Sequence, residues 1–378
     1  MKEPLVSILL PTCSRRAGGY LERAVSSVLG QTFRNFELIV IDDASIDGSR
    51  ELIRRYEQSD RRVSSIRLPR NTGLPALATF YGFQRARGEL IAFAFDDCVL
   101  YPDHLETLVS RMRTDGKLGM VYAQAYIMDS GGKRLIGSPL QMRQLDKANN
   151  HIPHVAAMVR RGVFSKVGWF DPHFLLCRFY DWDMWRRLAR VFPVAFVPKA
   201  VAEEFGAGLD DSFGRSYSLN TGLMLKYANI DRNALLLPEN MHRYSPFRLD
   251  LPFNKEEKRE LMALALEHFV LSHDADRIIG LVAGWEHRMN APGTALRFSK
   301  LKARNPHMDL RSLQLMHGLS EYARWKAETL TRETERMRQL FLEQHAFSQR
   351  QQQFIDAREA YIQQLLAMIR ELQRMAGG

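Results

Sequence analysis

The chain has 378 residues, of which 46% are hydrophobic, so it can bury at least one large core and form two or three structural units. Its net charge of +10 is not concentrated in any long Lys/Arg run, which argues against a dedicated nucleic-acid-binding protein. No apolar stretch reaches the roughly 18 residues needed to cross a bilayer, and no signal-peptide cleavage site is seen. We therefore predict a cytoplasmic protein whose three cysteines are reduced.

The first hundred residues alternate apolar runs with amphipathic segments, which is typical of βα units that build a largely parallel sheet. The predicted strands are 6–10, 36–41, 63–68 and 90–95. The predicted helices are 19–29, 49–58 and 74–86. Ligands of such sheets bind beyond the carboxyl ends of the strands, where the sequence places Thr12, Asp42, Asp43, Asp96 and Asp97.

Residues 101–204 have a mixed pattern, and a break in the pattern follows them. The predicted helices are 104–113 and 181–191, and the predicted strands are 120–127 and 155–159. A Gly-, Asp- and Ser-rich stretch at 206–218 is typical of a mobile loop and could form a lid.

The C-terminal part has a helical pattern of a different composition. Helices are predicted at 255–284 and 310–324. A long terminal helix is predicted at 321–376, because this segment contains neither Gly nor Pro. Apolar residues such as Tyr361, Met368 and Met375 form a near-heptad stripe, which favours a coiled coil and a homo-oligomer. Gln351 interrupts the stripe, so packing on the chain's own domain and contact with a membrane surface stay open.

Asp43 is the first candidate ligand-binding carboxylate. It follows the predicted strand 36–41, as Thr12 follows the neighbouring predicted strand 6–10. A carboxylate there can accept a hydrogen bond from the imide of uracil or thymine, or from ribose hydroxyls. The alternative is that such an Asp caps the following helix.

Asp96 and Asp97 end a predicted apolar strand side by side. Adjacent carboxylates repel each other, and a divalent cation shared with diphosphate oxygens would relieve that repulsion. Such a cation neutralises a nucleoside diphosphate as it leaves. The pattern thus predicts Mg2+ or Mn2+; a solvated turn in which Asp103 caps the next helix would leave Asp96 and Asp97 unexplained.

Asp181 and Asp183 lie just ahead of a helix rich in Trp and Arg. A carboxylate at this point could remove the proton from an attacking hydroxyl group. The alternative is a favourable interaction with the helix dipole, which we prefer for Asp183. Trp182 and Trp185 are expected in the core.

Seven segments in fixed order carry a resemblance to a known family. They are VSILLPT, QTFRNFELIVIDDAS, NTGLPALA, ARGELIAFAFDD, YPDHL, SKVGWFD and YDWDMWRRLA. Over residues 4–204 the chain resembles the family 2 inverting glycosyltransferases with the GT-A fold. The resemblance implies an α/β, Rossmann-like, mainly parallel sheet. It also implies transfer of a sugar, with inversion, from a UDP- or dTDP-sugar to an acceptor hydroxyl.

The resemblance also implies a role for each candidate residue. Thr12 and Asp43 would contact the base and ribose, and Asp96 the ribose or diphosphate. Asp97 would bind Mg2+ or Mn2+, and Asp181 would be the general base.

The expected organisation combines this family with the helical C-terminus. The expected parts are a nucleotide-sugar-binding half at 1–100, an acceptor-binding half at 101–215, a helical extension at 216–320 and the long helix or coiled coil at 321–376. The family's habits imply a saccharide or lipid-linked saccharide acceptor in bacterial surface glycan synthesis. A basic extension could hold the protein peripherally at the inner face of a membrane.

Two departures from the family pattern keep another class of function open. Phe95 stands at the first acid of the family's DxD element, and Tyr180 replaces the glutamate before Asp181. The alternative is therefore a catalytically inactive GT-A scaffold that acts as a binding or assembly module through its coiled coil. A nucleotidyltransferase would carry a Gly-rich phosphate loop after the first strand, which PTCSRRAGG matches poorly.

Overall fold

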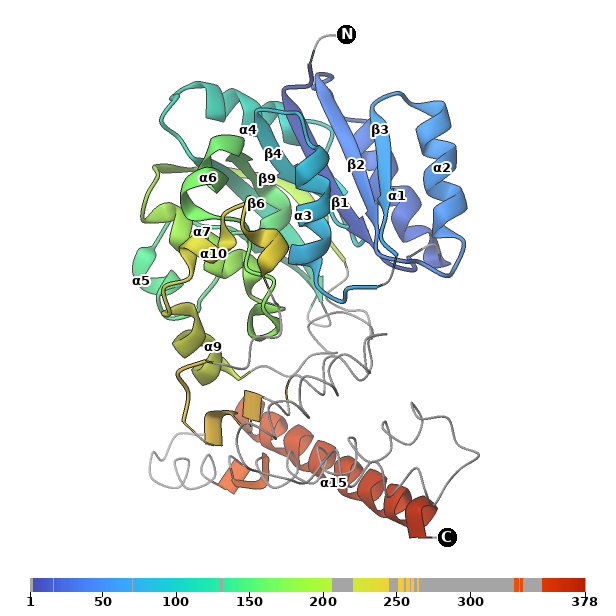
Figure 1. The fold of residues 1–378 in the computed structure, drawn as a ribbon, viewed down its shortest axis with the longest axis vertical. Helices are drawn as coiled ribbons and strands as arrows, with labels where there is room; N and C mark the ends of the chain where they lie inside the picture. The colour runs from blue at the N-terminus through green and yellow to red at the C-terminus, as the bar shows by residue number, and fades with distance from the viewer. Residues whose placement is uncertain are drawn as a thin grey trace. The chain divides into compact units, whose positions relative to one another are not determined.

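A computed structural model shows the fold of the chain (Figure 1). It describes residues 3–15, 17–69, 71–129, 132–205, 220–244, 251–254, 256–258, 260–261, 264, 330–332, 334–335 and 349–377. The chain divides into two compact units, Met1–Phe253 and Asn254–Gly378. Within the described ranges, no helix has the length and apolar character that a membrane span requires.

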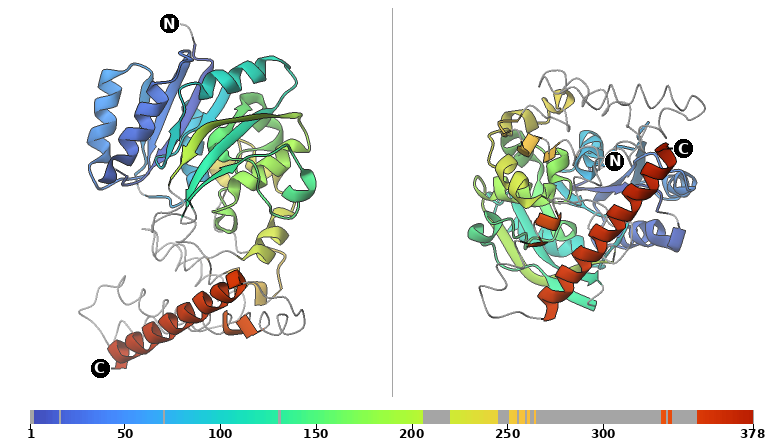
Figure 2. Two further views of the ribbon diagram at one scale, coloured as in Figure 1. Left: turned by 180° about the vertical axis from the view of Figure 1, so that it is seen from behind. Right: turned by 90° about the horizontal axis from the view of Figure 1, so that it is seen from below.

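The first unit is built on one twisted sheet with the strand order β3-β2-β1-β4-β8-β6-β9-β5, and β7 pairs with β6 (Figures 1 and 2). The strands are β1 (Val6–Thr12), β2 (Phe36–Asp42), β3 (Val63–Arg67), β4 (Leu90–Phe93), β5 (Cys98–Leu100), β6 (Met120–Asp129), β7 (Gly132–Ile136), β8 (Ala157–Arg160) and β9 (Val194–Glu204). Strands β3, β2, β1 and β4 are parallel, as are β6 and β9. The antiparallel pairs are β4 with β8, β8 with β6, β6 with β7, and β9 with β5. The predicted α/β fold is confirmed.

Helices cover both faces of this sheet (Figures 1 and 2). They are α1 (Tyr20–Leu29), α2 (Ser49–Ser59), α3 (Pro75–Arg85), α4 (His104–Arg113), α5 (Met142–Leu145), α6 (Phe164–Val167), α7 (Tyr180–Ala189), α9 (Thr221–Ala228) and α10 (Asn233–Leu236). The helices predicted in the first 190 residues are all present, and α4 has the predicted bounds.

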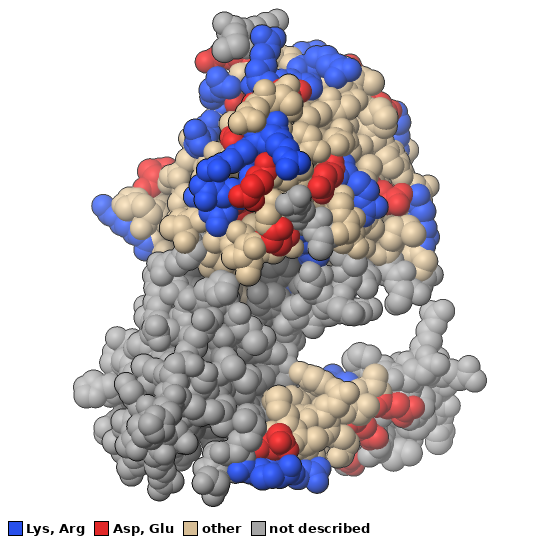
Figure 3. Space-filling model, turned by 90° about the vertical axis from the view of Figure 1, so that its right-hand side faces the viewer, with Lys and Arg blue, Asp and Glu red and all other residues tan. Residues whose placement is uncertain are grey.

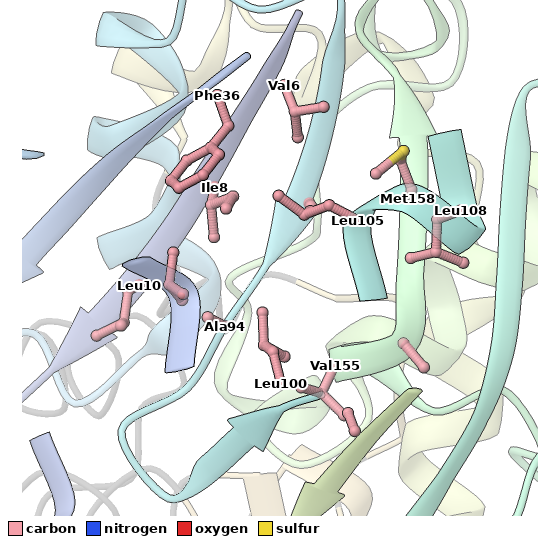
Figure 4. Close-up of a cluster of buried hydrophobic side chains, with 14 of the residues drawn as sticks. Val6, Ile8, Leu10, Phe36, Ala94, Leu100, Leu105, Leu108, Val155 and Met158 are labelled. Atoms are coloured by element: carbon pink, nitrogen blue, oxygen red, sulfur yellow. The ribbon is translucent and has the colours of Figure 1, made fainter. Parts of the chain in front are cut away.

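Strand β1 is buried on both faces, which explains why its sequence is a continuous apolar run rather than an alternating one. Val6, Ile8 and Leu10 join one core cluster with residues of α1 and α4, including Leu105 (Figure 4). Each such fully buried aliphatic side chain contributes about 1.5–3 kcal/mol. This core holds the carboxyl end of β1 in a fixed place.

Helix α3 packs on the opposite face of the sheet at very close range. A Cβ added at Gly82 would lie 2.7 Å from the Cδ1 atom of Ile41 and 3.2 Å from Leu9, so a larger residue does not fit there. The indole of Trp169 donates to the backbone oxygen of Ala76 in this helix at 2.8 Å. This hydrogen bond links a residue that follows β8 to the βα units of the first hundred residues.

The second unit contains the terminal helix, α15 (Gln349–Gly377). Ile362, Leu365 and Ile369 lie on one side of it and pack together with Leu330. The predicted terminal helix is present over Gln349–Gly377, whereas most of its predicted range before residue 349 lies outside the described residues. Self-association through this helix stays a prediction. The predicted lid at 206–218 and the predicted helix at 310–324 lie outside the described residues.

The surface of the first unit mixes charges of both signs on the face shown in Figure 3. Basic side chains stand beside acidic ones there rather than forming one continuous basic patch. One such neighbouring pair in the first unit is Arg62 with Asp60, at 2.7 Å. This arrangement agrees with the absence of any long Lys/Arg run in the sequence.

Candidate active site

The carboxyl ends of β1, β2 and β4 meet at one edge of the sheet. Thr12 is paired in register with Asp42, and Leu9 with Phe93. The backbone N–H of Asp43 donates to the Thr12 oxygen at 2.9 Å. The sheet therefore brings the predicted polar residues of these three strands together.

Asp42 and Asp43 are adjacent in sequence but have different partners. Asp42 accepts from the Ser45 backbone at 2.8 Å and pairs with the Arg67 guanidinium, so it supports the loop. Asp43 accepts from the backbone and the hydroxyl of Thr72, at 2.8 and 2.9 Å. Burial raises the pKa of Asp43, and the bonds from Thr72 oppose that shift. Neither carboxylate caps α2, whose N-cap residue is Gly48, so the capping alternative is wrong.

The loops that follow β1 and β2 are tied to each other. The Ser14 backbone donates to the Ser45 hydroxyl at 2.8 Å, and Ile46 donates to the Ser14 hydroxyl at 3.2 Å. Ser14 and Ala44 have φ angles of 53° and 60°, a left-handed conformation that costs energy in residues other than Gly. Such backbone strain is typical of functional sites, where the surrounding structure holds the loop in one conformation.

Asp96 and Asp97 lie in the turn between β4 and β5. Burial raises the pKa of Asp96, and the charge of Asp97 raises it further. The Arg15 side chain lies 3.8 Å from Asp96 and offsets part of this effect. The backbone oxygen of Asp97 accepts from Phe205 at 3.0 Å, which fixes the turn against the end of β9.

Glu204 is a further carboxylate at this edge, and it was not among the residues predicted from the sequence. It ends β9, where it is paired in register with Cys98 of β5, next to Asp97. Burial raises the pKa of Glu204, and so do the charges of Asp97 and Asp181. The preceding residue, Glu203, has other partners: Lys133 at 2.5 Å and the Tyr101 hydroxyl at 3.2 Å.

Asp181 stands in the first turn of α7, as predicted. One carboxylate oxygen accepts from its own helix, at the Trp182 backbone, at 2.7 Å. The other accepts from the side-chain amide of Asn150 at 2.8 Å. Burial raises the pKa of Asp181 to about 6. This is a range in which a carboxylate can act as a base near neutral pH.

Phe95 and Tyr180, the two departures from the family pattern, share one neighbour. The ring of His154 lies 4.9 Å from the Phe95 ring and 5.4 Å from the Tyr180 ring. Burial lowers the pKa of His154 to about 3, so the imidazole is neutral. Burial and the charge of Asp181 raise the pKa of Tyr180, so its phenol stays protonated beside the acids.

Asp183 anchors α7 rather than facing the site. It is fully buried and pairs with Arg187 at 2.8 Å and with Arg232 at 2.5 Å. Arg232 also pairs with the buried Asp171. The prediction that Asp183 only meets the helix dipole was therefore incomplete. Trp182 and Trp185 are fully buried, as expected of core residues.

The side-chain oxygen atoms at this edge of the sheet decide whether a divalent cation can bind there. Among the residues that the structure describes, no three His, Cys, Asp or Glu side chains are placed to enclose an ion. Mg2+ commonly needs only one or two carboxylates, since water and substrate phosphates complete its shell. Asp97, with Glu204 beside it, fits that second kind of site, where a cation would offset the crowding of negative charge.

The chain is similar to known glycosyltransferases in sequence. Residues 7–168 match the family model described as glycosyl transferase family 2. The putative teichuronic acid biosynthesis glycosyltransferase TuaG of Bacillus subtilis is 38% identical over 104 residues, which cover 28% of this chain and 40% of TuaG. The uncharacterized glycosyltransferase MJ1057 of Methanocaldococcus jannaschii is 27% identical over 194 residues, or 50% of this chain and 65% of the relative. The chain thus spans less than two thirds of these relatives.

A solved structure to which the chain is similar is S. aureus TarS 1-349 in complex with UDP-GlcNAc. It is 14% identical, with a TM-score of 0.48, over 84% of this chain and 80% of that one.

Proposed function

We propose that the chain is an inverting glycosyltransferase of family 2, which moves a sugar from a nucleotide-diphosphate sugar to an acceptor hydroxyl. The match of residues 7–168 to the model of glycosyl transferase family 2 supports this proposal. One observation carries the proposal. The charges of Asp97 and Asp181 both act on Glu204, so the acids assigned to the donor and to the acceptor lie in one cluster.

The donor is held at the ends of β1, β2 and β4. Asp43 accepts from the imide of the base, which favours UDP or dTDP, and Thr12 lines the same edge. The hydrogen bonds from Thr72 fix the Asp43 carboxylate and leave each oxygen a further lone pair. Asp96 supports the ribose or the diphosphate.

Asp97 would hold Mg2+ or Mn2+, with Glu204 beside it. The bound cation supplies neutralisation of the diphosphate as it departs. In its absence Asp97 and Glu204 would repel the diphosphate, so we expect donor binding to depend on the cation.

Asp181 is the general base of the reaction. It takes the proton of the acceptor hydroxyl as that oxygen attacks the anomeric carbon from the face opposite the diphosphate. The new glycosidic bond forms as the bond to the diphosphate breaks, so the configuration inverts and no covalent enzyme intermediate arises. The fixed geometry of Asp181 supports this role.

The acceptor in this proposal is a saccharide or lipid-linked saccharide of a bacterial surface glycan. The name of the TuaG relative supports this acceptor class. The same proposal includes a cytoplasmic location, peripheral contact with the membrane and a homo-oligomer formed through the terminal helix. It also includes domain boundaries near residues 100, 215 and 320.

A donor screen tests the proposed reaction. The protein is incubated with UDP- and dTDP-sugars and Mn2+, and the anomeric configuration of the released or transferred sugar is followed by proton NMR. We expect turnover of one donor class with inversion. Retention of configuration would contradict the assigned roles, and no turnover of any donor would favour the inactive scaffold, which Phe95 and Tyr180 keep as the second candidate.

The pH dependence of kcat/KM follows from the raised pKa of Asp181. The base must be ionised, so kcat/KM is expected to rise with pH and to level off above about 6. The raised pKa of Asp181 also affects the stability of the folded state, with the opposite dependence on pH. The folded state holds this proton more tightly, so the free energy of unfolding falls as pH rises from 3.8 to about 6. A rate profile that is flat between these values would contradict the assignment of Asp181.

A further inference from the structure

Among the residues that the structure describes, Asn150 is the one outside α7 whose side chain forms a hydrogen bond with the carboxylate of Asp181. We propose that Asn150 is a positioning residue that orients Asp181 for proton removal. This inference rests on the proposed function, in which Asp181 is the base. It adds a residue that lies in a loop before β8, outside every motif that carries the family resemblance.

The loop that carries Asn150 contacts α7 at two points. At its start, the Leu145 oxygen accepts from the Trp182 indole at 2.6 Å, and both residues are fully buried. Asp146 pairs with Arg190, at the far end of α7, at 2.5 Å. Two contacts to α7 thus fix the loop before it reaches Asn150.

The amide of Asn150 is also held in one orientation. Its oxygen accepts from the backbone of Ile152 at 3.2 Å, and Ile152 is buried. Its nitrogen therefore faces Asp181, to which it donates at 2.8 Å. A carboxylate can only accept, so this orientation is the one that satisfies both groups.

The bond from Asn150 acts on the geometry and the charge of Asp181 together. With the Trp182 backbone on one oxygen and Asn150 on the other, the plane of the carboxylate is fixed. Each oxygen keeps a lone pair for the acceptor proton. Burial otherwise disfavours a negative charge on Asp181, and that charge in turn acts on the neighbouring acid Glu204. Donation from Asn150 favours the ionised base.

The test compares Asn150→Ala and Asn150→Asp with Asn149→Ala in the full-length protein. Asn149 is exposed, and its side-chain amide donates to Gln144 rather than to Asp181, so it is a matched control. Loss of a hydrogen bond to a charged group is expected to lower kcat about 10- to 100-fold, with little change in KM for the donor. The acid limb of the pH profile should move to higher pH in Asn150→Ala and further in Asn150→Asp, where a like charge adjoins the base.

A second readout does not depend on turnover. The carboxyl carbon of Asp181, assigned by comparison with Asp181→Asn in protein labelled at Asp carboxyls, is titrated by 13C NMR. We expect its pKa to rise in Asn150→Ala and to stay in place in Asn149→Ala. An unchanged titration in Asn150→Ala, or the same shift in both variants, would overturn the inference. A shifted titration in a protein that turns over no donor would instead sustain the positioning and reject the proposed function.

Discussion

Replacing Asp181 with asparagine is expected to lower kcat by about 10²- to 10⁴-fold, the usual contribution of a general base. The amide keeps the size of the carboxyl but cannot take the proton of the acceptor hydroxyl. Donor binding should change little, because the residues assigned to the donor lie at the ends of β1, β2 and β4 rather than in α7. The measurement is initial rate at saturating donor, together with the dissociation constant of the nucleotide.

The matched control is Asp103→Asn. Asp103 is an exposed carboxylate that pairs with Lys199 away from the proposed reacting groups, so its loss should leave kcat almost unchanged. An Asp181→Asn protein that keeps a rate within a few-fold of wild type would show that another group removes the proton. Glu204 would then be the next carboxylate to replace.

Replacing Arg232 with methionine is expected to lower the free energy of unfolding of the first unit by about 3–5 kcal/mol. Arg232 is buried between Asp171 and Asp183, neither of which has any exposed surface. Removing the guanidinium leaves two carboxylates buried with fewer partners, and that uncompensated charge is the source of the cost. Urea denaturation followed by far-ultraviolet circular dichroism gives the change in unfolding free energy.

Lys199→Met is the control for a solvent-exposed ion pair. Lys199 and its partner Asp103 are 51% and 42% exposed, so this change should cost no more than about 1 kcal/mol. Equal effects of Lys199→Met and Arg232→Met would contradict the role given to the buried network. Asp183, the partner of Arg232, lies in the same first turn of α7 as Asp181. Loss of Arg232 should therefore also lower kcat, because it disturbs the helix that carries Asp181.

The parallel half of the sheet could be predicted because its signals are local. Strands buried on both faces are continuous apolar runs, and the helices between them have apolar residues at helical spacing. Strands β5 and β9 were missed for a different reason. Their pairing joins Cys98 to Glu204, more than a hundred residues apart, and β5 is only three residues long. A strand as short as β5 has no periodicity to detect, and the buried positions of β9 do not alternate regularly with the others.

The candidate site could be predicted only where an acid follows a recognisable strand or begins a helix. Asp97 and Asp181 meet that condition, and the structure brings both into the field of Glu204. Glu204 and Asn150 could not be found this way, because their importance comes from contacts made in the folded chain.

Neighbouring residues can also differ in ways that the sequence does not reveal. Asp42 and Asp43 are chemically identical, yet one pairs with Arg67 and the other with Thr72. Phe95 and Tyr180 lie far apart in sequence but pack on the same histidine ring. Both distinctions arise from tertiary packing rather than from local pattern.

Calorimetric titration of UDP, dTDP, GDP and CMP, with and without Mn2+, tests the central claim of a cation-dependent nucleotide-sugar site most directly. It is carried out on the wild type, on Asp97→Ala and Glu204→Gln, and on Glu203→Gln as the neighbouring control with other partners. We predict that UDP or dTDP binds only with Mn2+, that Asp97→Ala abolishes this binding, and that Glu204→Gln weakens it while Glu203→Gln does not. Binding of no nucleotide under either condition, or binding that is indifferent to both Mn2+ and Asp97, would contradict the claim.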